Sequence, residues 1–223
     1  MRWHIPLTAL ITDLVLFVPL YNWSKFNHVK RNIKLYIKGI CIGFPCIVLL
    51  AGIADLYSRG VLSTVSVIFF IGMLICAVGD IVLEIKFIRG GICFALGHCV
   101  YIAGLFLLFN KNFLLLCAGT FVFLLSLGSV LTHINLSKKY RIYLYLYNAV
   151  VSAGFSLALP LAFSGERGPA AIGTGIMMLV ISDWVLAGNK LTGNTFLKSL
   201  VALLLYFGGQ LLIAAYPFLV EFI

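Results

Sequence analysis

Two aspartates inside long apolar stretches are the residues of this sequence best suited to chemistry. Asp80 and Asp183 each follow a small residue, and Glu84 lies four positions after Asp80, on the same helix face. Two carboxyl groups that share a site of low dielectric cannot both ionise readily, so one keeps a proton near neutral pH. Such a pair can act as general acid and general base. The alternative is that each aspartate pairs with a lysine or a tyrosine and only holds helices together.

Further polar side chains fall at depths that place them near the aspartates. At a rise of 1.5 Å per residue, His98 and Lys38 lie in the same half of the bilayer as the two aspartates, and Gln210, about 20 Å deep, is expected to line a cavity floor. Polar residues with separate structural roles would not be expected to lie at the same depth in the bilayer. Asp13, near mid-span without an evident partner, is interpreted as a structural acid. The candidate supporting or substrate-binding residues are Lys38, Glu84, His98, Tyr101, Asn189, Lys190, Tyr206 and Gln210.

The cysteine and histidine pattern indicates neither a metal centre nor a cofactor. The six cysteines form no CxxC pair, and the four histidines are scattered along the chain. We therefore expect ordinary buried thiols and metal-free chemistry.

The elements that position these residues follow from composition. Of 223 residues, 62% are hydrophobic and 10% are charged, against roughly 45–50% and 25% in a soluble domain. This excludes a soluble enzyme, a disordered protein and, despite a net charge of +9, a nucleic-acid binder. Because a spanning helix needs about 20 apolar residues, the sequence predicts an all-α integral membrane protein, a bundle of eight transmembrane helices. The expected spans are residues 4–22, 35–54, 61–83, 91–109, 113–131, 142–163, 170–187 and 195–217.

The basic residues predict the orientation of the bundle. Twelve of the 16 lysines and arginines fall on the side of the odd-numbered loops, which predicts that these loops are cytoplasmic and attracted to anionic membrane lipids. We expect the inner membrane in a bacterium and the endoplasmic reticulum in a eukaryote.

A short internal similarity suggests duplication. Residues 79–90 align without gaps on residues 182–193, with four identities in twelve positions. We therefore expect one catalytic domain, residues 1–223, built from two parallel four-helix halves, 1–112 and 113–223. A pseudo-twofold axis would bring Asp80 and Asp183 to equivalent places facing one cavity.

At these residues the sequence resembles the lysoplasmalogenase family, the YhhN-like multipass membrane hydrolases. Gly79-Asp80-Ile-Val-Leu resembles the family's Gly-Asp-x-x-Leu helix end, and residues 87–101 resemble its Phe-x-x-Gly-x-x-x-Phe-x-x-Gly-His-x-x-Tyr helix. Similar elements also occur at Ser182-Asp183 with Asn189-Lys190, and at Tyr206 with Gln210. Lys38 is followed by Gly39, where the family pattern has a proline.

The resemblance implies hydrolysis of the vinyl ether bond of a lysoplasmalogen, a lysophospholipid, to a fatty aldehyde and a glycerophospho-ethanolamine or -choline. Protonation of the vinyl ether's β-carbon gives an oxocarbenium ion that water captures, a cation like that of glycoside hydrolysis. Asp80 and Asp183 would be the catalytic pair, in either order, and His98 and Tyr101 would orient an acid or the water. Lys38, Lys190 or Arg89 would hold the phosphate.

A small-molecule or lipid transporter is the alternative function, since transporters also carry internal repeats and intramembrane carboxylates. Transporters usually show helices broken by Gly or Pro at corresponding places, whereas the prolines here do not recur at the repeat offset.

Overall fold

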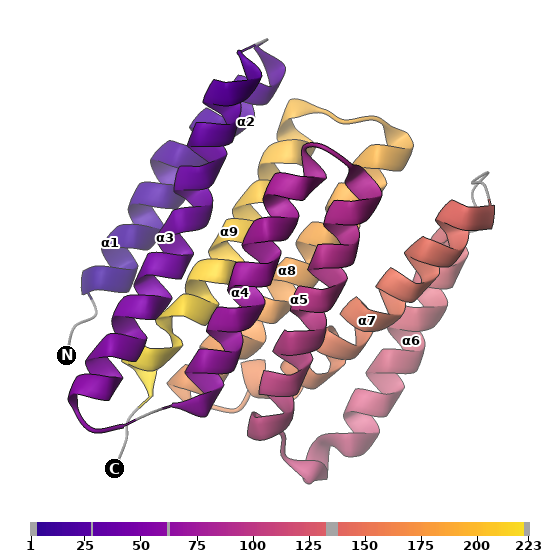
Figure 1. Ribbon diagram of the computed structural model, residues 1–223. Coiled ribbons are helices and arrows are strands. Elements are labelled where there is room, and N and C mark those ends of the chain that lie inside the picture. The colour runs from indigo at the N-terminus through magenta and orange to yellow at the C-terminus, as the bar shows by residue number, and fades with distance from the viewer. Residues whose placement is uncertain (1–3, 28, 62, 133–137, 221–223) are drawn as a thin grey trace.

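The computed structural model describes residues 4–27, 29–61, 63–132 and 138–220 as a bundle of long helices (Figure 1). Eight helical segments of these residues are long and apolar enough to cross a membrane, and no strand occurs within these ranges. The predicted all-α, eight-span architecture is therefore confirmed, and the chain is an integral multi-pass membrane protein.

The first span consists of α1 (His4–Thr12), a π-helical turn (Asp13–Phe17) and α2 (Val18–Phe26). Pro19 lies in the first turn of α2 and has no N–H to donate, which suits a wider turn before it. The span continues past its predicted end at residue 22, so Lys25 belongs to a helix and not to a loop.

The remaining helices have well-defined ends. Ser63 and Thr195 cap α4 and α9 by accepting hydrogen bonds from the N–H groups of Ser66, at 3.2 Å, and Lys198, at 3.4 Å. Gly193 ends α8 with a φ of 92°, a conformation that favours glycine. The helices are α3 (Arg31–Ser58), α4 (Thr64–Leu83), α5 (Phe87–Leu108), α6 (Leu114–Thr132), α7 (Lys138–Ala162), α8 (Arg167–Thr192) and α9 (Phe196–Leu219), with a 3-10 turn (Lys111–Phe113) before α6.

Two helical hairpins, α4–α5 and α8–α9, form the middle of the bundle. Helix α3 packs against α9, α7 packs against both α5 and α8, and α6 lies at the edge against α7 (Figure 1). The α4–α5 and α8–α9 connections lie at the same end of the bundle, opposite the start of α1 (Figure 1). We call this the connection end. The internal repeat stays a prediction.

Helices α4 and α5 approach closely because glycines line their interface. A Cβ atom on Gly72 would lie 2.6 Å from the ring of Tyr101, and one on Gly79 would lie 3.2 Å from Cys93. Gly79 immediately precedes Asp80, so the lack of a side chain there lets α5 pack beside the aspartate. Ser182, before Asp183, acts differently: its hydroxyl donates to the Ala202 carbonyl of α9 at 2.7 Å.

Candidate active site

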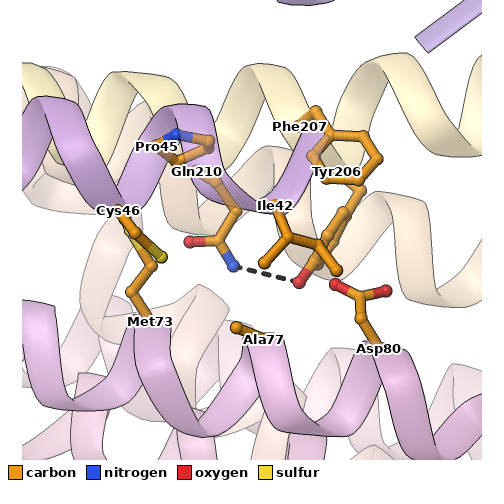
Figure 2. A pocket seen from close by; sticks show the side chains of 9 residues that line it. All are labelled: Ile42, Pro45, Cys46, Met73, Ala77, Asp80, Tyr206, Phe207 and Gln210. Carbon is orange, nitrogen blue, oxygen red and sulfur yellow. Dashed lines mark hydrogen bonds between the residues drawn. The ribbon is translucent and has the colours of Figure 1, made fainter. Parts of the chain in front are cut away.

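Two neighbouring cavities near the connection end contain most of the candidate residues. The wide cavity has an empty volume of about 560 Å³, its open mouth included, and mostly polar residues line it, Asp80, Glu84 and Asp183 among them. The narrow cavity, shown in Figure 2, has about 190 Å³ and largely apolar walls from α3, α4 and α9. Asp80 and Tyr206 line both cavities and therefore stand where the two meet.

Asp80 is held by the ammonium group of Lys38, which comes from the first half of α3. Lys38 Nζ lies 3.3 Å from Oδ1 of Asp80 and donates to the Asp80 backbone carbonyl at 2.8 Å. Both side chains are more than nine-tenths buried. The second carboxylate oxygen of Asp80, Oδ2, is buried and has no hydrogen-bond partner among the described residues. One oxygen of Asp80 is thus fixed by a cation, while the other is buried without a hydrogen-bond partner among the described residues.

Glu84 completes the ion pair at the end of α4. Lys38 Nζ donates to its Oε1 at 3.1 Å, and the Tyr21 hydroxyl of α2 donates to the same oxygen. Burial alone would raise the pKa of Glu84, but the Lys38 ammonium and the Tyr21 hydroxyl outweigh burial and hold that pKa below its ordinary value. Glu84 therefore links α2 and α3 to α4 beside Asp80.

A chain of hydroxyl and amide groups approaches Asp80 from the other side. Tyr101 donates to Oε1 of Gln210 at 2.8 Å, and the Gln210 amide donates to the Tyr206 hydroxyl at 3.4 Å. Figure 2 shows Tyr206 next to the Asp80 carboxylate, with Gln210 on the wall of the narrow cavity. Because Tyr206 accepts from Gln210, its own proton can turn toward Asp80. These hydrogen bonds connect Tyr101 to Tyr206, which lies beside Asp80, and Gln210 lines a cavity as expected.

Asp183 lies on the wall of the wide cavity and is held by two donors on Oδ2. The Tyr147 hydroxyl of α7 donates at 2.7 Å, and Nε2 of His98 on α5 lies at 3.1 Å. His98 Nδ1 is buried without a hydrogen-bond partner among the described residues, so a proton there would be unsatisfied. The geometry thus gives the donor role to Nε2, the ring nitrogen that faces Asp183.

Other candidate residues lie apart from this site. Asn189 is buried on α8 but lines neither cavity. Lys190 belongs to α8, but its side chain lies outside the described residues. Asp13, in the π-helical turn, is fully buried beside Cys41 and lines neither cavity. Among the described residues, no group of three His, Cys, Asp or Glu side chains could hold a metal ion.

The structure also adds residues that sequence reasoning did not select. Tyr147 contacts Asp183 directly, and Tyr21, Lys25 and Ser199 line the wide cavity. The sequence predicts that Tyr147 belongs to a transmembrane span, but it does not predict which helix packs against the face that carries Tyr147. Lys25 was assigned to a loop because the first helix extends farther than its apolar run.

The arrangement suits acid–base chemistry on a molecule that enters the wide cavity. Asp80 and Asp183 both line this cavity, and each has one oxygen fixed by protein donors. Fixing one oxygen orients the carboxyl group and leaves the other for substrate or water.

Comparison with known proteins identifies the family of this chain. Searches of curated proteins and of solved structures gave no match. The model of the YhhN family matches residues 34–216, a range that contains Lys38, both aspartates and Gln210. Since this match covers most of the sequence and all the candidate residues, the chain belongs to the YhhN family.

Proposed function

We propose that this protein is a lysoplasmalogenase, which hydrolyses the vinyl ether bond of a lysoplasmalogen inside the membrane. The observation that carries the proposal is the position of Asp80 and Asp183 on one cavity, with a second, largely apolar cavity next to it that Asp80 also lines. Membership of the YhhN family supports the same function, as does the resemblance of the two aspartate segments to lysoplasmalogenases.

The two cavities suit the two ends of a lysolipid. The wide cavity takes the polar headgroup and glycerol, and the narrow cavity takes the first carbons of the alkenyl chain. The narrow cavity has only about 190 Å³ of empty volume, open space included, so it takes no more than the part of the chain next to the reacting bond. The predicted orientation places the headgroup at the cytoplasmic surface.

This placement gives the aspartates different roles. From the headgroup, the reacting atoms follow in the order glycerol oxygen, α-carbon and β-carbon, so the β-carbon lies nearest the narrow cavity. Asp80, where the cavities meet, donates its proton from Oδ2 to the β-carbon, and the double-bond electrons form the new C–H bond. The α-carbon becomes an oxocarbenium carbon beside the wide cavity, which Asp183 lines.

Water completes the reaction on the side of Asp183. Its oxygen attacks the α-carbon while Asp183 accepts its proton, which gives a hemiacetal. The hemiacetal O–H then forms the aldehyde carbonyl as the α-carbon to glycerol-oxygen bond breaks. The leaving oxygen takes the proton from Asp183, and the hemiacetal proton returns to Asp80. Lys38 and Tyr206 orient Asp80, whereas His98 and Tyr147 orient Asp183.

The test is aldehyde release from lysoplasmenyl-ethanolamine by the purified protein. Asp80→Asn and Asp183→Asn are compared with Asp55→Asn, a change to an aspartate whose ion pair with Arg59 lies at the end of α3. We expect turnover in the parent and in Asp55→Asn, and at least about 100-fold slower turnover in the two site variants. Undiminished turnover in folded Asp80→Asn and Asp183→Asn would contradict the roles. A parent inactive on both ethanolamine and choline substrates would contradict the function.

A further inference from the structure

An open groove runs between α1 and α3, apart from the two cavities of the candidate active site. The two helices lie side by side at one edge of the bundle (Figure 1). The groove between them has an empty volume of about 1190 Å³, its open side included, and it shares no lining residue with either cavity. Its described lining residues carry no charge and are mostly apolar. The groove therefore suits a hydrocarbon chain.

Two glycines of α3 leave the floor of the groove bare. A Cβ atom on Gly39 or Gly43 would meet no atom of the described residues within 4 Å, whereas one on Gly52, farther along α3, would lie 2.7 Å from Pro217 of α9. Glycines four residues apart let a partner approach the backbone of a transmembrane helix closely. At Gly39 and Gly43 no described segment of the chain makes that approach, so the floor is open to another molecule.

The length of the groove matches the acyl chains of one leaflet. Its lining runs along α3 from Leu35 to Val48, which is about 20 Å at a rise of 1.5 Å per residue. The hydrocarbon core of a bilayer is about 30 Å thick, so the chains of one leaflet span about 15 Å of it. Tyr36, which lines the groove near the connection end, is 76% exposed, as is typical of tyrosines at the level of the lipid headgroups. In the predicted orientation this is the cytoplasmic leaflet.

Cations lie at the connection end of the groove. Lys30 and Arg31 are exposed at the start of α3. Arg31 precedes the lining residue Leu35 by four positions and therefore lies one turn above it on the same side of the helix. No described carboxylate forms an ion pair with either cation. Because anionic lipids attract cations at the membrane surface, this end of the groove complements a negatively charged headgroup.

We infer that the groove binds one acyl chain of an anionic phospholipid of the cytoplasmic leaflet, with the lipid phosphate at Arg31. A second copy of the chain fits these charges less well. Copies in one membrane share an orientation, so a twofold pair of α3 helices would bring the same residues together at the same depth. Arg31 would then face Arg31, and such like-charge contacts are costly. This lipid is a bound partner and not the substrate, because the groove is separate from Asp80 and Asp183.

The experiment measures lipid binding to the purified full-length chain. The protein in a nonionic detergent is titrated with dioleoyl phosphatidylglycerol and, in parallel, with dioleoyl phosphatidylcholine, and native mass spectrometry gives the apparent Kd of the first bound lipid. Gly43→Leu fills the floor of the groove. Its matched control is Gly119→Leu on α6, where an added Cβ atom also meets no atom of the described residues within 4 Å. Arg31→Met removes the cation, and Lys111→Met, a change to an exposed cation in the 3-10 turn before α6, is the control for charge.

We expect the parent to bind phosphatidylglycerol at least about 5-fold more tightly than phosphatidylcholine. Gly43→Leu should bind both lipids more weakly than Gly119→Leu does, because the leucine side chain occupies the place of the acyl chain. Gly39→Leu, a second variant that fills the groove, should act in the same way. Arg31→Met should lose most of the preference for phosphatidylglycerol and keep the parent's affinity for phosphatidylcholine, whereas Lys111→Met should bind both lipids like the parent.

Three results would overturn the inference. Equal lipid binding by the folded groove variants and Gly119→Leu would show that the groove is not the site. A parent that binds both lipids alike, or an Arg31→Met protein that keeps the full preference, would contradict recognition of the anionic headgroup at Arg31. A dimeric parent that Gly43→Leu, but not Gly119→Leu, converts to monomers would place a second copy of the chain in the groove instead.

Discussion

The ion pair between α3 and α4 gives a quantitative prediction for Lys38→Met. The change removes the cation from Asp80, whose side chain is 8% exposed, and from Glu84, whose side chain is 34% exposed. With Asp80 protonated as the general acid, the charge that loses its partner is that of Glu84, and this more exposed pair is screened by water. Oδ1 and the backbone carbonyl of Asp80 also lose a donor, and leaving buried acceptors unsatisfied costs about 1–3 kcal/mol. A loss of about 2 kcal/mol is therefore expected, which for a chain of this size lowers Tm by about 4–8 °C.

Thermal unfolding in detergent, followed by tryptophan fluorescence, checks this prediction. Lys34→Met, which removes a nearby cation that no described carboxylate contacts, is the control and should leave Tm within about 2 °C of the parent. The double variant Lys38→Met/Glu84→Gln removes both charges of the ion pair and should recover part of the loss. A Lys38→Met protein as stable as the Lys34→Met control would refute the idea that Lys38 holds Asp80 and Glu84 together.

Three further predictions follow from individual contacts. The ion pair with Lys38 holds the pKa of Glu84 below its ordinary value, so it stabilises the fold above the unfolded pKa of about 4.3 and this stabilisation is lost as the pH falls through the lower folded pKa. Tm should therefore fall more steeply between about pH 5 and 3 in the parent than in Glu84→Gln. Parallel profiles of Tm against pH would show that Glu84 adds no acid sensitivity. Asp13→Asn should keep both Tm and aldehyde release, since Asp13 contacts no described cation and lines neither cavity, and an inactive but folded variant would place Asp13 in the mechanism. Gly72→Ala should lower the free energy of unfolding by about 1–3 kcal/mol, because the added Cβ atom would clash with the Tyr101 ring. Gly39→Ala should leave it unchanged, because a Cβ atom there has no neighbour within 4 Å. Equal denaturation curves for the two variants would contradict the close packing of α4 and α5.

Much of the fold could be predicted because the membrane restricts the choices. Apolar runs of about 20 residues must become helices in lipid, and the expected spans agree with the helices of the structure to within a few residues at most ends. The first span differs because the π-helical turn and α2 continue through polar residues to Phe26. Along this extension, Tyr21 donates to Glu84 at the end of α4 and Lys25 donates to Ser199 of α9. Such contacts between distant segments could not be predicted from the local sequence pattern.

The site was predictable in part for the same reason. An ionisable group in lipid needs a cavity or a partner, which identified Asp80, Asp183, Lys38 and His98 from their depth alone. Depth does not tell which faces meet, so the pairing of Asp183 with both His98 and Tyr147 could not be predicted. Likewise, Lys38 was expected to bind phosphate because the sequence does not show that three protein acceptors surround its ammonium group.

The most direct test of the central claim is where solvent hydrogen enters the product. The parent protein hydrolyses a lysoplasmenyl-ethanolamine in D2O, and the aldehyde is reduced at once with borohydride so that the label cannot exchange. Protonation of the β-carbon by Asp80 predicts one deuterium at carbon 2 of the resulting alcohol and a chain of unchanged length, with labelled product nearly absent from Asp80→Asn. An alcohol without deuterium at carbon 2, or equal yields of labelled alcohol from folded Asp80→Asn and the parent, would contradict the account.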